Sequence, residues 1–240
     1  MKKPSLLNNV RIVLSHTSHP GNIGAAARAM KTMGLHSLYL VQPRQFPDNE
    51  ATARATGASD VLDQARVCES LDEALAGTAL AVAVSARRRD LSHKVMTPRE
   101  AAAVLLTHAS TQQVALVFGN ETSGLSNAEA SKCQMLTSIP ANPDFTSLNL
   151  AAAVQVLSYE LNVALPDTAI QTEKIRALAS FEDVEIFYRR LEQMLIETEF
   201  LNPAEPKRLM QRIRRLFART RLEPEELAIL HGILTAIRNG

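Results

Sequence analysis

Tryptophan is absent from this sequence, cysteine occurs only twice, and aromatic residues make up 4% of the chain. Cys68 and Cys133 lie far apart and do not have the spacing of a metal site, so we expect two reduced thiols in a cytosolic protein. His16 and His19 lie three residues apart, but no third candidate ligand lies near them. The sequence therefore does not predict a metal site.

Long hydrophobic runs are also missing. The longest apolar stretches, such as 79–84 and 114–118, have the length of strands and fall well short of the roughly 18 apolar residues of a membrane span. The first ten residues include two lysines but no apolar segment long enough for a secretion signal. We therefore expect a soluble cytoplasmic protein with no membrane association. With 46% apolar residues, a chain of 240 residues can bury a full core.

Neither sign of charge dominates, since the formal net charge is +1, but the charges are unevenly placed. Residues 207–221 contain seven basic residues and no acidic one, whereas 181–200 contain six acidic residues against two arginines. One face of the basic segment carries a row of arginines, namely Arg208, Arg212, Arg215 and Arg219. The row is either a solvated surface or a site of phosphate contact. Because the segment contains no acidic residue that could neutralise the arginines at i,i+4, we favour phosphate contact.

Short apolar segments alternate with helical patterns over the first two thirds of the chain. The expected strands are 10–14, 37–41, 80–85, 114–118 and a short one near 136–139. The expected helices are 22–33, which ends at Gly34, and 98–106, which Thr97 caps; residues 51–76 are expected to be helical and irregular. This alternation predicts an α/β fold with a mostly parallel sheet covered on both faces.

The pattern changes after residue 165. We assign 1–165 to the α/β domain, 166–180 to a linker and 181–240 to a small basic helical C-terminal domain. The expected helices of that domain are 182–199, 206–219 and 224–238.

The segment 139–161 is predicted to be the centre of the candidate site. It crosses a polar loop and becomes a helix at Ser147 or Asn149 that is apolar on nearly every side, so we expect this helix to be buried. Ser147 and Asn149 are then polar groups at a buried helix N-terminus, where unpaired backbone N–H groups favour the polar end of a ligand.

The loops that follow strands of a parallel sheet gather at one edge, so the polar segments after the first, third, fourth and fifth strands should meet. A dinucleotide site is one interpretation, because Gly21 and Gly24 lie between a strand and a helix. It fails because the G-x-G-x-x-G spacing is absent and no acidic residue follows the second strand to hold a ribose.

Three ordered motifs in these loops resemble those of a known class of enzymes. They are Asn22-x-Gly24 with Arg28, then Phe118-Gly-x-Glu121-x-x-Gly124-Leu125, then Ile139-Pro140 with Ser147-Leu-Asn149-Leu150. Together they resemble the SPOUT class of RNA methyltransferases, and most closely its TrmH-like ribose 2′-O-methyltransferases. The segments Thr17-Ser-His-Pro-Gly-Asn22 and Ser85-Ala-Arg-x-Arg89 and the basic helical tail are similar to the TrmJ branch. The resemblance covers nearly the whole chain.

The resemblance implies a fold, a cofactor and a substrate. Members of the class thread the C-terminal part of the α/β domain into a trefoil knot, bind S-adenosylmethionine within it, and act as homodimers with the active site at the subunit interface. Members of the TrmJ branch methylate the ribose of cytidine or uridine at position 32 of the tRNA anticodon loop. Tight positioning of a donor and a hydroxyl suffices for this chemistry, so no metal is expected.

The same resemblance assigns individual residues. The cofactor is expected to contact Ser85, Ala86, Gly119, Ile139, Ser147 and Leu148. The polar catalytic set is expected to be Asn22, Arg28, Glu121, Ser147 and Asn149. Contacts to RNA are expected from Arg87, Arg89, Arg208, Arg212, Arg215 and Arg219. One position departs from the branch, which more often has an arginine where this chain has Asn120.

The roles of three of these residues remain open at this stage. Arg28 either accepts the 2′-hydroxyl proton transiently or orients a phosphate and stabilises the developing alkoxide; we favour the second role, because a guanidinium stays protonated. Arg28 could also simply pair with an acid on the helix surface. Glu121 either takes part in the chemistry or ties its loop together, and Asn149 either contacts substrate or caps its helix.

Four functions remain to be separated. The leading one is a tRNA ribose 2′-O-methyltransferase, and the nearest alternative is an enzyme of the same class that acts on ribosomal RNA. A third is a non-catalytic RNA-binding protein that retains the knot. A fourth is a nucleotide-dependent enzyme of an unrelated α/β fold, which predicts a monomer that does not bind S-adenosylmethionine.

Overall fold

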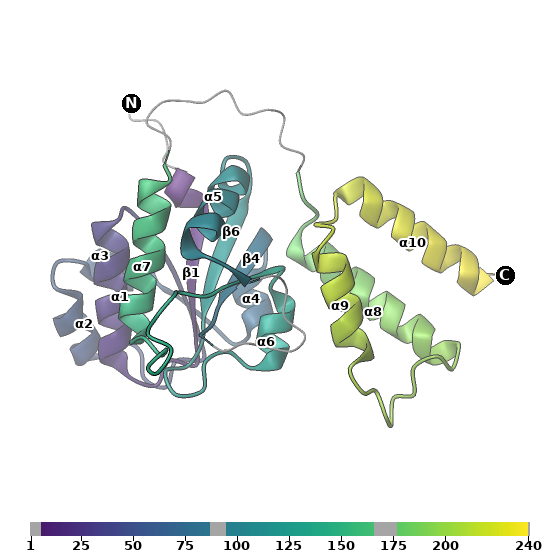
Figure 1. Cartoon of the computed structure of the whole chain (residues 1–240), viewed down its shortest axis with the longest axis horizontal. Coiled ribbons are helices and arrows are strands. Elements are labelled where there is room, and N and C mark those ends of the chain that lie inside the picture. Colours follow the sequence, from purple (N-terminus) through teal and green to yellow (C-terminus); the bar gives the residue numbers. More distant parts are fainter. Residues whose placement is uncertain (1–5, 87–94, 166–176, 240) are drawn as a thin grey trace.

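The computed structural model describes residues 6–86, 95–165 and 177–239. An α/β domain forms one part of the molecule, and three helices near the C-terminus stand beside it (Figure 1). None of the helices in these described ranges is long and apolar enough to cross a membrane.

A seven-stranded sheet in the order β3-β2-β1-β6-β4-β7-β5 forms the centre of the α/β domain, and every paired strand is parallel to its neighbour. The strands are β1 (Val10–Ser15), β2 (Ser37–Val41), β3 (Arg66–Cys68), β4 (Thr78–Val84), β5 (Val95–Met96), β6 (Gln113–Phe118) and β7 (Met135–Thr137). The prediction of a mostly parallel sheet is thereby confirmed. The two strands that the sequence did not predict, β3 and β5, are short edge strands of three and two residues.

Helices cover both faces of the sheet. They are α1 (Pro20–Thr32), α2 (Asn49–Ala55), α3 (Ser59–Asp63), α4 (Leu71–Leu75), α5 (Pro98–Ala109), α6 (Asn127–Lys132) and α7 (Leu150–Val163), after a short 3-10 helix at Leu6–Asn9. Residues 51–76, expected to be helical and irregular, form three short helices interrupted by β3.

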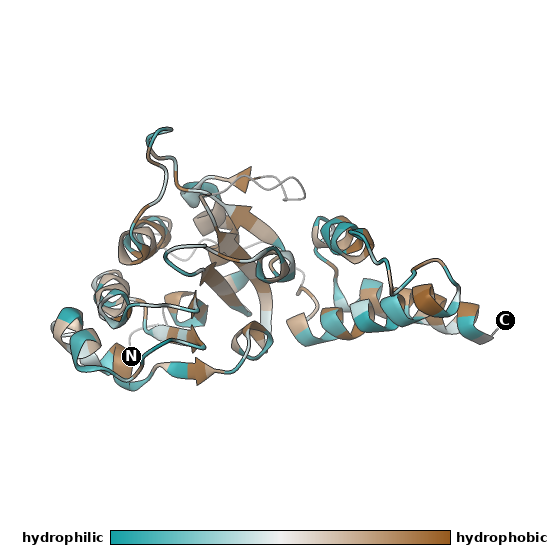
Figure 2. Ribbon diagram, turned by 90° about the horizontal axis from the view of Figure 1, so that it is seen from below, coloured by the Kyte–Doolittle hydropathy of each residue, from teal (hydrophilic) through white to brown (hydrophobic). Residues whose placement is uncertain are grey.

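Each strand divides its side chains between two cores because successive residues of a strand point to opposite faces. On β1, Ile12 and Leu14 pack in the core under α1, α5 and α7, whereas Val13 packs in the core under α4 and α6. The central strands are therefore apolar on both faces, as in other covered parallel sheets. Figure 2 shows mostly hydrophobic central strands beside helices in which hydrophobic and hydrophilic residues are interspersed.

A close approach of two helices depends on Gly24. A Cβ atom on Gly24 would lie 2.0 Å from the carbonyl oxygen of Ala51, so no larger residue fits between α1 and α2. The contact between α1 and α2 holds the start of α1 in place. The position of the loop before α1 is thereby set, because this loop runs directly into the helix.

Strand β7 lies between β4 and β5, which are consecutive strands of the chain. The chain then continues into α7, which packs against α1 and α5. Entry of a later strand between two consecutive ones is the arrangement that the predicted trefoil knot requires; the knot itself stays a prediction.

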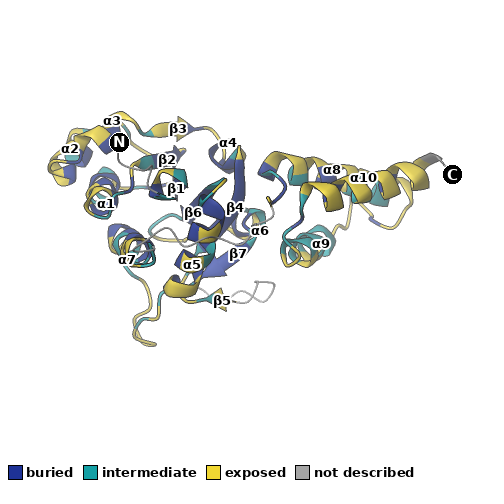
Figure 3. Ribbon diagram, turned by 90° about the horizontal axis from the view of Figure 1, so that it is seen from above, coloured by how far each residue is buried: buried dark blue, intermediate teal, exposed yellow. Residues whose placement is uncertain are grey.

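The N-terminus of α7 differs from the expectation. The helix begins at Leu150 with Asn149 as its cap, and Leu150 and Ala151 of its first turn are buried. Both Ser147 and Asn149 are exposed, so the prediction that these two polar groups are buried at the helix start is wrong. Expected burial on all sides is also wrong, because Tyr159 and Val163 are 50% and 54% exposed. Figure 3 shows the loop that leads into α7 projecting from the domain as exposed ribbon.

The C-terminal helices are α8 (Phe181–Glu197), α9 (Leu209–Ala218) and α10 (Pro224–Asn239). They share a small core around Phe187, Tyr188 and Leu234. Ile213 and Phe217 of α9 pack against this core, whereas Leu216 of the same helix is 50% exposed.

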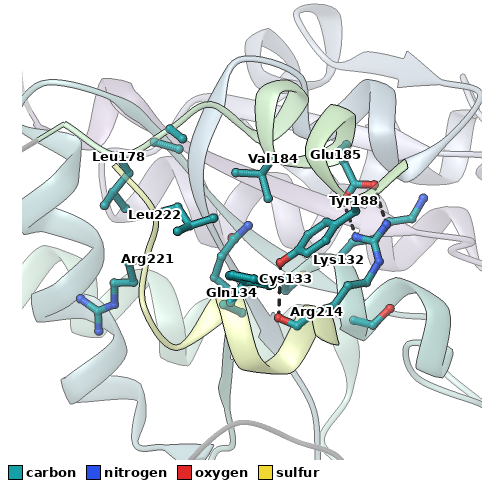
Figure 4. A pocket seen from close by; sticks show the side chains of 15 residues that line it. Lys132, Cys133, Gln134, Leu178, Val184, Glu185, Tyr188, Arg214, Arg221 and Leu222 are labelled. Carbon is teal, nitrogen blue, oxygen red and sulfur yellow. Dashed lines mark hydrogen bonds and ion pairs between the residues drawn. The ribbon is translucent and has the colours of Figure 1, made fainter. Parts of the chain in front are cut away.

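Polar contacts join these helices to the α/β domain. The side-chain amide of Gln112 bonds both the N–H and the carbonyl of Leu178, and Glu182 accepts a 2.6 Å hydrogen bond from the backbone N–H of Gly77. A small cavity of about 30 Å³ remains at the junction, with Cys133 and Tyr188 among its lining residues (Figure 4). Burial raises the pKa of the Cys133 thiol to about 12, so this cysteine is an unreactive thiol.

Candidate active site

The loops after β4, β6 and β7 surround a pocket of about 250 Å³ at the carboxyl edge of the sheet. All six residues that the sequence predicted to contact a cofactor line this pocket, namely Ser85, Ala86, Gly119, Ile139, Ser147 and Leu148. Glu121 of the predicted catalytic set lines it too. The structure thus assembles in one place residues that are spread over 64 positions of the chain.

The wall of the pocket has an apolar part and a polar part. Phe118, Ile139, Leu148 and Leu150 supply apolar surface, while Ser85, Asn120 and Thr122 supply polar groups. Sequence reasoning missed Phe118, Asn120, Thr122 and Leu150 as lining residues, although all four lie inside or next to the motifs quoted above.

Gly119 determines how closely the β6 loop folds back on itself. A Cβ atom on this residue would lie 2.1 Å from the backbone nitrogen of Leu125 and 2.2 Å from the carbonyl carbon of Gly124. Only glycine fits, because both neighbours are backbone atoms that cannot move away. Asn120 closes the same loop, since its side chain accepts a hydrogen bond from Thr122 N–H and donates one of 2.7 Å to the carbonyl of His16.

The Glu121 carboxylate connects the β6 loop to the loop after β1. Its Oε2 accepts hydrogen bonds from the backbone N–H and the hydroxyl of Ser18, at 2.9 and 2.8 Å. Its Oε1 accepts from the side-chain amide of Asn22 at 2.9 Å and from His19 N–H at 3.3 Å. Burial alone would raise the pKa of Glu121, but the bonds from Ser18 and Asn22 outweigh it and hold the pKa below its ordinary value.

Four donors therefore occupy an ionised carboxylate. Such a group has little capacity left to accept a proton from a substrate, and this geometry favours the second role considered for Glu121, that of tying the loops together. Ser18, which makes two of the four bonds, was not among the predicted site residues, although it lies in the quoted segment 17–22.

Asn22 and Asn149 extend this network to α7. The side-chain amide of Asn149 donates to the Asn22 side-chain oxygen at 2.9 Å. Its own oxygen accepts from the N–H groups of Ala151 and Ala152, at 2.9 and 3.4 Å. Two of the backbone N–H groups that were expected to be available to a ligand are thus bonded by the cap.

Arg28 belongs neither to the pocket lining nor to the hydrogen-bond network of Glu121, Asn22 and Asn149. It lies on the exposed side of α1 and is not among the residues that line the pocket. Within the described ranges it has no hydrogen-bond or ion-pair partner, so no helix-surface ion pair of the kind considered for it forms there. An exposed arginine that has no partner among the described residues can reach groups outside this chain.

The basic segment divides into two kinds of arginine. Arg208, Arg212 and Arg219 are exposed and Arg215 is half-exposed, whereas Arg214 forms two hydrogen bonds to the Glu185 carboxylate of α8. Arg214 also lies over the ring of Tyr188, with 4.3 Å between the guanidinium carbon and the ring centroid (Figure 4). Arg87 and Arg89, also predicted to contact RNA, lie outside the described residues.

Family models match two parts of the chain. Residues 9–159 match the SpoU rRNA Methylase family, and residues 182–239 match the C-terminal domain of the tRNA methyltransferase TrmJ. The chain belongs to the SpoU methylase family. This membership confirms the SPOUT resemblance and shows that the chain is a methyltransferase rather than an unrelated nucleotide-dependent enzyme.

Similar curated proteins extend over nearly the full length. The chain is 47% identical to the tRNA (cytidine/uridine/adenosine-2′-O-)-methyltransferase TrmJ of Pseudomonas aeruginosa, over 96% of this chain and 94% of that protein. It is 48% identical to the tRNA (cytidine/uridine-2′-O-)-methyltransferase TrmJ of Yersinia pestis, over 97% of this chain and 92% of that protein.

Solved structures share the fold. The crystal structure of TrmJ from Z. mobilis superposes with a TM-score of 0.85 at 32% identity, covering 95% of this chain and 98% of that one. The SpoU methyltransferase AviRb from Streptomyces viridochromogenes, solved with the cofactor AdoMet, has a TM-score of 0.51 at 25% identity, over 63% of this chain and 58% of that one.

Proposed function

We propose that this protein is an S-adenosylmethionine-dependent tRNA 2′-O-methyltransferase that modifies the ribose of cytidine or uridine at position 32 of the anticodon loop. The observation that carries the proposal is the pocket of about 250 Å³, which gathers all six residues predicted for the cofactor in a chain that belongs to the SpoU methylase family. The tRNA substrates named for the relatives from Pseudomonas aeruginosa and Yersinia pestis support the choice of RNA. An enzyme acting on tRNA would work in the cytoplasm.

The lining of the pocket suits the proposed cofactor. Apolar walls from Ile139 and Leu148 would hold an adenine ring, and the tight backbone of the β6 loop around Gly119 would offer it peptide groups for hydrogen bonding. When bound, S-adenosylmethionine supplies a methyl group on an activated sulfonium. The task left to the protein is to align the ribose hydroxyl with that methyl group and to assist loss of the proton.

The network of Glu121, Asn22 and Asn149 supports this alignment. It connects the loop after β1, the loop after β6 and the start of α7, and the last two of these also form the pocket wall. We assign the three residues to positioning. Arg28 is assigned to the substrate phosphate and the developing alkoxide, since an exposed guanidinium remains charged and donates hydrogen bonds only.

Placement of Arg28 outside the pocket favours a homodimer. A second subunit could supply its own Arg28 to the pocket, and the exposed apolar residues Tyr159 and Val163 of α7 offer contact surface for such a subunit. The proposed active site would then be complete only at the subunit interface.

Contacts to tRNA beyond the pocket are assigned to α9. Arg208, Arg212, Arg215 and Arg219 have no ion-pair partner among the described residues and lie on an exposed or half-exposed surface. Phosphate contacts of this kind position an RNA without reading its sequence.

The proposal is tested by incubating purified protein with labelled S-adenosylmethionine and unmodified tRNA or ribosomal RNA in parallel. Label on the tRNA, at a ribose of one anticodon-loop pyrimidine, is expected. Ribosomal RNA is the second candidate, because the matching family model is described for rRNA. Label only on ribosomal RNA would select that candidate, and label on neither RNA would contradict the proposal.

A further inference from the structure

Phe145 is the most exposed large apolar residue among those that the structure describes, at 77%. Exposed aromatic side chains are few in this chain, and within the described ranges they are Phe145, Tyr159 and Phe200. Phe200 belongs to the C-terminal helical part, and Tyr159 lies well inside α7. Phe145 alone lies in the loop that leads to the pocket.

The backbone around Phe145 forms a defined turn. The N–H of Phe145 donates a 2.9 Å hydrogen bond to the carbonyl of Asn142, and the N–H of Asp144 donates one of 3.0 Å to the Asn142 side chain. Pro143 lies inside the same turn and restricts its backbone further. The aromatic ring is therefore presented from a preformed turn, and ordering it costs little conformational entropy on binding.

The turn lies at the edge of the pocket. Thr146, Ser147 and Leu148, the three residues that follow Phe145, all line it. Consecutive Cα atoms are about 3.8 Å apart, so the Cα atom of Phe145 lies within about 4 Å of that of a lining residue. If the target ribose reaches into the pocket, the base attached to it must lie close to this turn.

The charge of this segment excludes phosphate as its ligand. Residues 139–149 contain no lysine or arginine, and Asp144 next to Phe145 is acidic. A phosphate would be repelled here, whereas an aromatic ring offers a face for stacking that every nucleobase can use. Proteins that recognise unpaired RNA commonly stack bases on aromatic side chains in this way.

We propose that Phe145 stacks on the nucleobase of the target nucleotide and is the residue that holds this base while its ribose is methylated. The proposal rests on the proposed function. It also gives a physical reason for accepting more than one base, because stacking does not read the hydrogen-bonding edge.

The stacking is tested by measuring the KM for tRNA of enzymes substituted at Phe145. Phe145→Ala and Phe145→Leu should each raise the KM for unmodified tRNA about tenfold, while Phe145→Tyr should stay within about twofold of the wild type, because only tyrosine retains the ring. The affinity for S-adenosylmethionine alone, measured by calorimetry, should not change. Phe200→Ala, which removes a ring that is 69% exposed in another part of the chain, is the matched control and should leave both quantities unchanged.

Absence of tryptophan from the chain provides an independent readout. Phe145→Trp introduces a single indole fluorophore, which a stacked base should quench when an anticodon stem-loop RNA is added. S-adenosylmethionine alone should not quench it, and Phe200→Trp should respond to neither addition. This titration measures binding and is readable even if wild-type protein fails to methylate tRNA, in which case the proposed function fails separately.

Three results would overturn the proposal. Cofactor affinity that falls together with the KM effect would make Phe145 a wall of the cofactor pocket. Dissociation of a wild-type dimer in Phe145→Ala, detected by analytical ultracentrifugation, would make the ring a subunit contact. A Phe145→Leu enzyme with the wild-type KM would show that the ring is not stacked.

Discussion

Asn149 donates a hydrogen bond from its side-chain amide to the side-chain oxygen of Asn22, 2.9 Å away, although the two residues are 127 positions apart in the sequence. Each amide in this network has its orientation fixed by a neighbour. Asn149 must present its oxygen to the N–H groups of α7, and Asn22 must present its N–H group to the Glu121 carboxylate. The network therefore runs from a helix N-terminus, which carries positive partial charge, to an anion. This polarity makes it a rigid link between the loops of the candidate site.

Replacing Glu121 tests this link. Glu121→Gln keeps the shape of the side chain but places an NH₂ group against donors from Ser18 and Asn22, so the loops should separate slightly. We expect methyl transfer to slow by about tenfold to a hundredfold because the loop that lines the pocket is displaced. Methylation rates measured under single-turnover conditions check this. Glu69→Gln, on the exposed surface, is the control and should retain wild-type rates.

The pH dependence of stability follows from the lowered pKa of Glu121. Because the folded protein holds this carboxyl ionised more strongly than the unfolded chain does, its contribution is fully present above the ordinary glutamate pKa of about 4.3. It is lost as the pH falls through the lower folded pKa. Urea unfolding should show wild type more stable than Glu121→Gln by about 1 kcal/mol near neutrality, with the difference closing in acid. A difference that is independent of pH would contradict this account.

The residues of the candidate cofactor pocket could be predicted from the sequence, but the hydrogen-bond network of Glu121, Asn22 and Asn149 could not. Gly119 directly follows β6, and Ser147 lies in the loop that leads into α7; local patterns predict both positions. Exposure of Asn149 could not be predicted, because an apolar helix pattern does not show which of its sides a neighbouring element covers. Edge strands β3 and β5 were missed because segments of two or three residues show no periodicity.

Arg212 and Arg215 should matter for RNA binding alone. Replacing both with alanine removes two positive charges from α9 without breaking any ion pair among the described residues. The plot of log affinity for tRNA against log salt should flatten by about 1.5 units of slope. Filter binding at several salt concentrations measures this slope. Cofactor affinity should be unchanged, and an equal loss of both affinities would show that α9 has a structural role instead.

Arg214, unlike Arg212 and Arg215, should matter for the stability of the fold. Its side chain is 20% exposed, and its guanidinium forms two hydrogen bonds to the carboxylate of Glu185, whose side chain is 14% exposed. Removing one partner leaves the other charge buried, which costs about 3 kcal/mol. Arg214→Ala should therefore lower the unfolding midpoint in urea, while Arg212→Ala leaves it unchanged. Sequence alone could not separate these neighbours, since Glu185 belongs to another helix. Equal stability of the two variants would argue against the ion pair.

A site shared between subunits predicts complementation. Arg28→Ala and Leu148→Arg, which fills the pocket, should each inactivate the homodimer. In a mixed dimer, the intact pocket of one subunit would meet the intact Arg28 of the other, so co-expression should restore part of the activity. If Arg28 acts on the pocket of its own chain, every site in the mixed dimer carries a lesion and no activity returns. Differently tagged subunits allow the mixed dimer to be purified and assayed.

The central claim concerns one hydroxyl group, and a single-atom change in the substrate tests it most directly. Two synthetic tRNAs, one with a 2′-deoxyribose at position 32 and one with the same change at position 34, are incubated with the protein and labelled S-adenosylmethionine. Our account predicts no methyl incorporation into the first tRNA. The second tRNA should be methylated as fully as a tRNA that has a ribose at every position. Equal labelling of the first tRNA and an unmodified one would contradict methylation of the ribose at position 32.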